Sequence, residues 1–145
     1  MIIRDAFPSD EPLWRRLWDG YVTFYEASVP EEVTARTWER LIRKEQGMFC
    51  RVAEVSGEVC GFTNSVLHAG TWSLGPICYL EDLFVAPERR GRGIGEALIR
   101  DLLNMAKANS WSGLYWVTRS SNTAARSVYD RFIKADDFVR YRMDF

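Results

Sequence analysis

Apolar residues recur every three or four positions in two stretches near the start of the chain, which is the spacing of one helix face. The first stretch follows Pro8, Ser9 and Asp10, residue types that form turns and cap helices. The second runs from Pro30 to about Arg43, where the proline favours a first helical turn. The pattern therefore predicts two consecutive helices. Candidate buried positions in the second are Val33, Trp38, Leu41 and Ile42.

A second pattern, in which apolar and polar residues alternate, predicts strands in the rest of the chain. Ser56 and Gly57 separate two alternating runs and predict a hairpin turn between them. Pro87 ends a dense apolar run, and after it a glycine-rich loop leads into a helix. Strands are predicted at 2–7, 48–55, 59–67, 77–85, 114–118 and 138–145, and further helices at 93–109 and 121–132.

The order of these elements is β-α-α-β-β-β-α-β-α-β, which predicts a mixed α/β fold. Neither a repeat nor a linker divides the 145 residues, so we expect one domain over 1–145. Hydrophobic residues make up 47% of the chain, enough for a buried core. A net charge of -1 provides no broad field for a nucleic-acid backbone, so nucleic-acid binding is an alternative that rests only on the arginines at 89–92.

The sequence carries no recognisable signal for export or membrane insertion. Its first residues lack the basic start and apolar run of a secretory signal, and no window of about eighteen apolar residues occurs. Cys50, Cys60 and Cys78 are odd in number and widely spaced, which indicates reduced thiols. His68 is the only histidine, so no multi-histidine metal site is indicated. We expect a cytoplasmic protein with no metal ion and no membrane partner.

The loop at 89–95 combines three arginines with three glycines between a predicted strand and a predicted helix. Glycine lets backbone N–H groups approach a bulky anion closely, and a helix N-terminus adds favourable partial charge. A dinucleotide fingerprint needs a third glycine where Glu96 stands, and the Lys-Ser or Lys-Thr pair of a P-loop is missing. The loop therefore predicts an anion site that neither common nucleotide motif describes.

The segment 79–98, YLEDLFVAPERRGRGIGEAL, resembles the GNAT N-acetyltransferase superfamily, whose signature is Arg/Gln-x-x-Gly-x-Gly/Ala at a strand-loop-helix junction. Arg90, Gly93 and Gly95 match that signature. The LED-x-x-V strand is especially similar to diamine (spermidine/spermine) acetyltransferases. The segment 114–132, LYWVTRSSNTAARSVYDRF, resembles the HPA-type protein and D-amino-acid acetyltransferases.

A second family motif, Asn-x-x-Ala-x-x-x-Tyr, is matched by Asn122, Ala125 and Tyr129. In many members a Gly-Phe pair then opens the last strand, whereas residues 132–137 intervene here. The resemblance implies a GNAT-type mixed sheet and a homodimer, as in related enzymes. The alternating terminal strand at 138–145 could pair or swap between subunits.

The resemblance implies acetyl-CoA as the co-substrate, bound beside the fourth strand. Its pyrophosphate would lie on the backbone N–H groups of 91–96, where the glycines and the helix end already favour an anion. Its pantetheine arm would bond to the backbone of 83–85, with the N–H of Leu83 facing the thioester oxygen. The implied cofactor-binding residues are Leu83, Phe84, Val85, Arg90, Gly91, Arg92, Gly93, Ile94, Gly95, Glu96, Asn122 and Tyr129.

Acetyl transfer requires a neutral amine, yet an alkyl ammonium has a pKa of about 10, so a base must take its proton. Glu81 matches the glutamate of the diamine acetyltransferase motif and is the implied base, with Asp82 as the fallback. Alternation is expected to send these neighbours to opposite faces, so that only one reaches the amine. Tyr129 matches the family's proton donor to the leaving thiolate. Direct transfer is favoured over a covalent step on Cys78, because no lowered thiol pKa is indicated.

The sequence leaves more than one class of acceptor molecule open. The strand motif favours a small cationic amine such as a polyamine or an amino acid, while the HPA-like segment keeps protein lysines and N-termini as an alternative. A catalytically silent CoA-binding sensor is another alternative, which the joint presence of Glu81 and Tyr129 disfavours. Tyr25 and Glu26, at the end of the first helix, are candidate substrate-binding residues together with Asp82.

Overall fold

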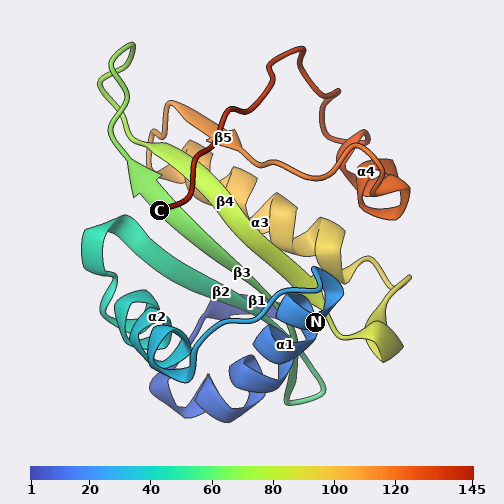
Figure 1. The fold of residues 1–145 in the computed structure, drawn as a ribbon. Coiled ribbons are helices and arrows are strands. Elements are labelled where there is room, and N and C mark those ends of the chain that lie inside the picture. The colour runs from blue at the N-terminus through green and yellow to red at the C-terminus, as the bar shows by residue number, and fades with distance from the viewer.

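The computed structural model describes residues 1–145 and contains one five-stranded sheet in the order β1-β2-β3-β4-β5 (Figure 1). Successive strands from β1 to β4 pair antiparallel, whereas β5 lies parallel to β4. The sheet is therefore mixed, as predicted. The strands span Ile2–Asp5 (β1), Met48–Val55 (β2), Glu58–His68 (β3), Ile77–Val85 (β4) and Gly113–Tyr115 (β5).

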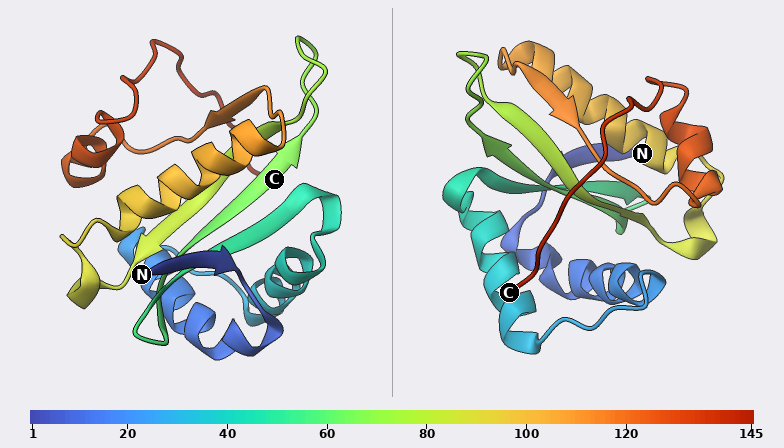
Figure 2. Two further views of the ribbon diagram at one scale, coloured as in Figure 1. Left: turned by 180° about the vertical axis from the view of Figure 1, so that it is seen from behind. Right: turned by 45° about the horizontal axis from the view of Figure 1, so that its top comes forward.

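Helices cover both faces of the sheet (Figure 2). α1 (Glu11–Phe24) and α2 (Glu31–Arg43) pack on one face, and α3 (Ile94–Ala108) packs on the other with the short α4 (Thr123–Tyr129). The first two helices, the hairpin and α3 confirm the elements predicted from periodicity. None of the helices combines the length and apolar character that crossing a membrane requires. Single turns of 3-10 helix occur at Pro8–Asp10 (η1), Glu45–Gly47 (η2) and Pro87–Arg89 (η3).

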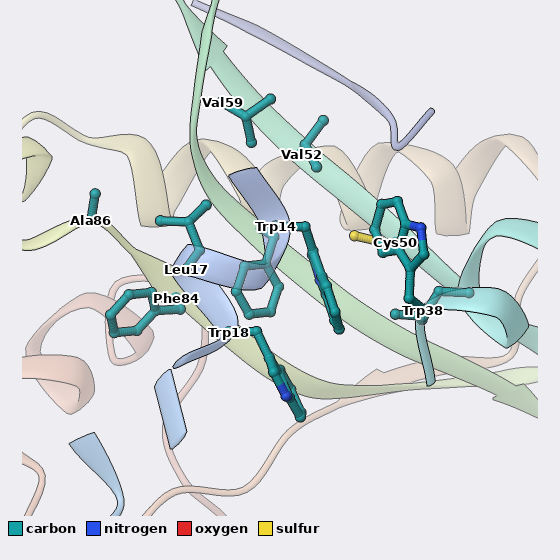
Figure 3. Close-up of a cluster of buried hydrophobic side chains, with 11 residues drawn as sticks. Trp14, Leu17, Trp18, Trp38, Cys50, Val52, Val59, Phe84 and Ala86 are labelled. Carbon is teal, nitrogen blue, oxygen red and sulfur yellow. The ribbon is translucent and has the colours of Figure 1, made fainter. Parts of the chain in front are cut away.

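Three tryptophans lie at the centre of the core between the sheet and the first two helices (Figure 3). Trp14 is fully buried, and its ring centroid lies 5.3 Å from that of Trp18 and 4.9 Å from that of Trp38. The predicted burial of Val33 is wrong, since its side chain is 44% exposed. The adjacent Thr34 turns inward instead, because its hydroxyl accepts a hydrogen bond from the indole of Trp18 at 3.1 Å.

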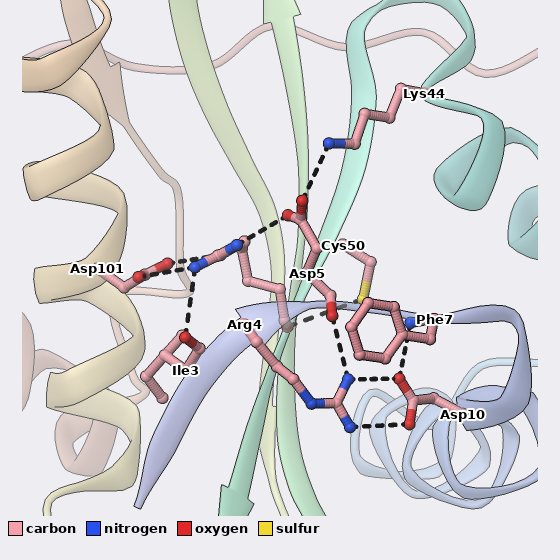
Figure 4. A network of polar contacts seen from close by, with 9 residues as sticks. Ile3, Arg4, Asp5, Phe7, Asp10, Lys44, Cys50 and Asp101 are labelled. Atoms are coloured by element: carbon pink, nitrogen blue, oxygen red, sulfur yellow. Dashed lines mark hydrogen bonds and ion pairs between the residues drawn. The ribbon is translucent and has the colours of Figure 1, made fainter.

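Two arginines attach the edge of the sheet to the helices (Figure 4). Arg4 on β1 donates to both carboxylate oxygens of Asp10, at 2.7 and 3.0 Å, and to Glu54 at 2.8 Å. Arg51 on β2 donates to both oxygens of Asp101 on α3, at 2.7 and 3.0 Å. Bidentate pairs of this kind combine charge with a fixed geometry. Asp10 precedes α1 as predicted, but its carboxylate binds Arg4 instead of capping the helix.

The C-terminal end differs from the prediction, because no strand forms at 138–145 and β5 has only three residues. Alternation describes the side chains of a strand, but a strand also needs a partner edge, and β5 is too short to provide one. The arm at 133–145, red in Figure 2, therefore runs on from α4 without strand pairing. Its exposed apolar side chains are Ile133, Phe138, Val139, Tyr141, Met143 and Phe145.

Candidate active site

The sheet opens between β4 and β5. β5 pairs with β4 at three positions only, where 77–79 face 113–115. Beyond this point no strand lies beside that edge of β4, so backbone groups of 80–85 are available to a ligand that bonds like a strand. The backbone contacts predicted for a pantetheine arm, at 83–85, fall within this open edge.

An extra residue in β4 changes which side chains face the helices. The β3 residues opposite Leu80 and Asp82 are consecutive, so Glu81 has no partner and forms a β-bulge. Leu80 and Leu83 both pack in the apolar cluster beside α3, with two residues between them instead of one. The expectation that alternation separates Glu81 and Asp82 onto opposite faces is therefore wrong, because the bulge interrupts the alternation.

Asp82 is a partly buried carboxylate with two polar neighbours. The side-chain nitrogen of Asn64 donates to its Oδ2 at 3.0 Å, and the hydroxyl of Tyr21 on α1 lies near it and favours its ionised form. Burial raises the pKa of Asp82 to about 6, the like charge of Glu81 adds to the rise, and Tyr21 and Asn64 oppose it. Glu81 itself is exposed. A carboxylate with such a pKa can accept a proton near neutral pH.

Tyr129 lies on α4 with its ring edge-on to that of Trp116, 5.5 Å between centroids. Burial raises the pKa of Tyr129 to about 12, with a further contribution from Tyr25. Its phenol is therefore protonated at neutral pH and can donate that proton. Tyr25 packs against Tyr21, the neighbour of Asp82, with ring centroids 5.0 Å apart. Glu26 is exposed.

The loop before α3 has the backbone of an anion site. Gly91 and Gly93 have φ angles of 72° and 76°, in the left-handed region that favours glycine. No backbone N–H from 91 to 96 donates a hydrogen bond within the chain. Arg90 donates from Nε to the carbonyl oxygen of Val85 at 3.0 Å, which ties the loop to the end of β4. Free N–H groups at a helix N-terminus are the usual donors to a phosphate.

The side chains of this loop and of the first turn of α3 contribute less than its backbone. Arg92 is exposed, and Ile94 is buried in the core. Glu96 accepts from Arg100 at 2.7 Å and from Arg131 at 3.2 Å, and the bond from Arg100 is the main cause that lowers its pKa. At 94–96 only the backbone N–H groups are therefore available for the predicted contacts with an anion.

Asn122 caps α4 instead of lying on its face. Its Oδ1 accepts from the backbone N–H of Ala125 at 3.4 Å, and its Nδ2 donates to the hydroxyl of Thr118 at 3.2 Å. The helix begins at Thr123 and is shorter than the predicted 121–132. Asn122, which the predicted helix includes, therefore lies just outside the observed one.

The acetyltransferase (GNAT) family model matches residues 14–133 of the chain. The chain belongs to the GNAT family. The D-amino-acid N-acetyltransferase HPA3 of Saccharomyces cerevisiae is 28% identical over 144 residues, which cover 98% of this chain and 89% of that protein. The uncharacterized N-acetyltransferase YhfO of Bacillus subtilis is 33% identical over 144 residues, which cover 97% and 95%. The structure of AAC(6')-Iy in complex with the bisubstrate analog CoA-S-monomethyl-acetylneamine matches with a TM-score of 0.81 and 19% identity, and the match covers 99% of this chain and 98% of that chain.

The family and these relatives make the chain an acetyl-CoA-dependent N-acetyltransferase, as the two sequence motifs predict. The mixed sheet with helices on both faces likewise confirms the predicted GNAT-type fold class.

One polar residue of this GNAT enzyme, Asn64, was missed as a site residue from the sequence. Tyr21 lies on the apolar face of the first helix, where the sequence allows a pocket wall or a core position, but its place beside Asp82 was not predicted. Asn64 lies between Thr63 and Ser65 on the central strand β3 and is only 3% exposed. An amide at such a position needs a hydrogen-bond partner, and that need is the signal that could have identified it.

A cavity of about 600 Å³ lies between α1 and the end of β4 in this GNAT enzyme. Its walls include Phe84, Arg89 and Arg90, but Asp82 does not line it. The guanidinium of Arg90 lies 5.2 Å from the ring centroid of Phe84, and Arg89 pairs with Glu58 at 2.8 Å. The cavity therefore adjoins the anion-binding loop, and two of its three arginines, Arg89 and Arg90, already have partners within the protein.

Proposed function

We propose that this enzyme acetylates a primary amine of a small molecule by direct transfer from acetyl-CoA bound beside β4. The observation that carries the proposal is the Asp82 carboxylate, partly buried at the bulge of the strand whose edge is open and with a pKa raised to about 6. A group of this kind, on the strand expected to bind the thioester, is suited to take a proton from the attacking amine.

Acetyl-CoA fits two features of the backbone. The free N–H groups at 91–96 suit its pyrophosphate, because glycine allows a close approach and the helix N-terminus favours negative charge. The open edge of β4 suits the amides of its pantetheine arm at 83–85. When bound, acetyl-CoA supplies the thioester that the amine attacks. The N–H of Leu83 would then stabilise the negative charge that develops on the thioester oxygen.

Asp82 and Tyr129 are suited to opposite proton transfers. An alkyl ammonium with a pKa of about 10 must lose a proton before it attacks, and Asp82 is mostly ionised at pH 7 and able to accept it. The half-buried phenol of Tyr129 keeps its proton at the same pH and can give it to the leaving thiolate. Burial and hydrogen bonding support Asp82 as the base in preference to the exposed Glu81.

Amino acids and polyamines are the acceptors that we propose. Similarity over 98% of the chain to a D-amino-acid N-acetyltransferase supports an amino acid. The neighbouring carboxylates of Glu81 and Asp82 favour a cationic amine of either kind. Protein lysines or N-termini are the alternative within the family. A silent CoA-binding sensor is disfavoured, since it would need neither the raised pKa of Asp82 nor the protonated Tyr129.

Release of free CoA thiol tests the acceptor class across polyamines, amino acids of both hands, aminoglycosides and a lysine-containing peptide. We expect an amino acid or a polyamine to exceed the peptide in kcat/KM by about tenfold or more. A peptide as the best acceptor would instead establish the protein acetyltransferase. Silence across the panel, together with tight acetyl-CoA binding by calorimetry, would establish the sensor.

Buried thiols support both a cytoplasmic location and direct transfer. Cys50, Cys60 and Cys78 are free and buried, which suits a reducing compartment. Burial raises the pKa of the Cys78 thiol to about 11, so little thiolate forms at neutral pH. A covalent acetyl group on Cys78 would need that thiolate, so the amine is better placed to attack the thioester itself.

We also propose a homodimer joined through the arm at 133–145, whose apolar side chains find no cover in one chain. Sedimentation equilibrium should give twice the 16.8 kDa of one chain. The double variant Phe138→Asp, Tyr141→Asp should sediment as a monomer, because these side chains are 87% and 93% exposed and would be desolvated at the interface. Leu74→Asp, an equally exposed apolar site in another loop, is the control and should leave the mass unchanged. A wild-type mass of one chain would exclude the dimer.

A further inference from the structure

A line of hydrogen bonds leads from the core to the proposed base. The indole Nε1 of Trp14 donates to Oδ1 of Asn64 at 3.4 Å, and Nδ2 of Asn64 donates to Oδ2 of Asp82 at 3.0 Å. Trp14 and Asn64 are 0% and 3% exposed. The rings around Trp14 fill the space on its own side of the sheet (Figure 3). The inner part of this line is therefore closed to water, and each group depends on the next for its partner.

The indole fixes the direction of the line. An indole N–H can only donate, so the amide of Asn64 must turn its oxygen toward Trp14. Its NH₂ group then points at Asp82, whose ionised carboxylate can only accept. The reversed amide would set two donors against each other at Trp14 and two acceptors against each other at Asp82. Trp14 therefore holds Asn64 in the one orientation that favours an ionised Asp82.

Sheet geometry fixes the position of Asn64 as well. Asn64 on β3 lies directly opposite Asp82 on β4, at the step where the bulge begins. The other titratable groups that act on this carboxylate or respond to it are Tyr21 on α1, Tyr79 and Glu81 on the same strand and Cys50 on β2. Of these, Tyr21 favours the ionised form of Asp82 and Glu81 repels its charge, while Asn64 donates the hydrogen bond that the carboxylate accepts at 3.0 Å.

We propose that Asn64, held by Trp14, is a positioning residue that fixes Asp82 in the orientation and ionisation state that proton abstraction requires. This inference rests on the proposed role of Asp82 as the base. Asn64 touches neither acetyl-CoA nor acceptor in this account and acts only through the carboxylate. Burial raises the pKa of Asp82, and the hydrogen bond from Asn64 counteracts that rise. Without this donor the pKa of Asp82 would be higher, so the protonated, inactive carboxyl would persist to higher pH.

The test compares Asn64→Leu with wild type in two measurements. Titration of the Asp82 carboxyl carbon by NMR, without substrate, should show its midpoint raised by about one pH unit, because hydrogen bonds to charged groups favour the charged form by about that much. The acid limb of kcat/KM should move by the same amount in the same direction. Affinity for acetyl-CoA should not change, since the backbone of the anion-binding loop is untouched.

Further variants separate this role from a general loss of structure. Thr63→Val is the matched control, because Thr63 is a fully buried neighbour on β3 whose hydroxyl has no partner, and it should leave both measurements unchanged. Trp14→Phe should raise the Asp82 midpoint by a smaller amount, since Asn64 keeps its donor but loses its fixed orientation. If Asn64→Leu fails to fold, Asn64→Ser replaces it, because the shorter side chain cannot reach Asp82 but stays polar.

The outcomes distinguish this inference from the proposed function. An Asp82 midpoint that does not move when Asn64 is replaced overturns the positioning role, whatever the activity of the variant. A raised midpoint with a matching shift of the acid limb supports it. Full activity of Asp82→Asn would overturn the base itself, and this failure is recognised separately because the NMR titration is read without turnover.

Discussion

Asp82→Asn should lower kcat/KM at pH 7 by about 10²- to 10⁴-fold and leave the affinity for acetyl-CoA unchanged. The amide keeps the size of the carboxylate but cannot accept the proton of the acceptor ammonium. In the wild-type enzyme kcat/KM should fall as the pH drops below about 6, since the base works only when ionised. That acid limb should be absent from the variant. Steady-state kinetics from the acidic to the alkaline range measure both effects.

Glu81→Gln is the matched control, because it removes the same charge from the adjacent residue. We expect kcat/KM to change by less than about tenfold, since Glu81 is exposed at the bulge. Loss of the nearby negative charge should also move the acid limb slightly downward, because that charge helps to raise the pKa of Asp82. If Glu81→Gln removed the acid limb and Asp82→Asn retained it, the assignment of the base would be reversed.

Gly93→Asp should weaken acetyl-CoA binding by about a hundredfold or more, because it places a carboxylate where the pyrophosphate is expected to lie. Two effects add. The carboxylate repels the pyrophosphate, and its own position at the helix N-terminus competes for the same N–H groups. Calorimetric titration with acetyl-CoA measures the dissociation constant directly.

The backbone at Gly93 would also be strained by any side chain, and Gly57→Asp controls for that strain. Gly57 and Gly93 have φ angles of 81° and 76°, and an added Cβ meets no atom within 4 Å at either position. Gly57 lies in the turn between β2 and β3, so its replacement should lower stability by a similar amount and leave binding intact. Wild-type affinity in Gly93→Asp would exclude the loop as the pyrophosphate site.

Periodicity predicted most of the fold because each helix and strand buries one face against a common core. The first helix is an example, since Trp14, Trp18 and Tyr21 recur at the spacing that brings them all onto the sheet. The same method failed for 138–145, where the side chains alternate but no edge is available to pair with them. Pairing depends on where distant residues lie, and a local pattern contains no information about that.

In the candidate site, too, local features were predictable from the sequence and long-range contacts were not. The glycines at 91 and 93 were predictable because their backbone freedom and the helix that follows are local properties. The contact between Asn64 and Asp82 joins residues 18 positions apart, so it depends on the register of two strands. The bulge at Glu81 is likewise visible only once the partner strand shows that a residue has been inserted.

The open edge of β4 has a consequence for the lifetime of the protein as well as for its chemistry. Backbone groups at 80–85 without a neighbouring strand form a template on which another chain can add a strand, which is the first step of aggregation. Pantetheine bound there would cover the same groups and exclude such pairing. By mass action the bound form would also be harder to unfold. The supply of acetyl-CoA would therefore govern how long the enzyme stays soluble and intact, in addition to how fast it works.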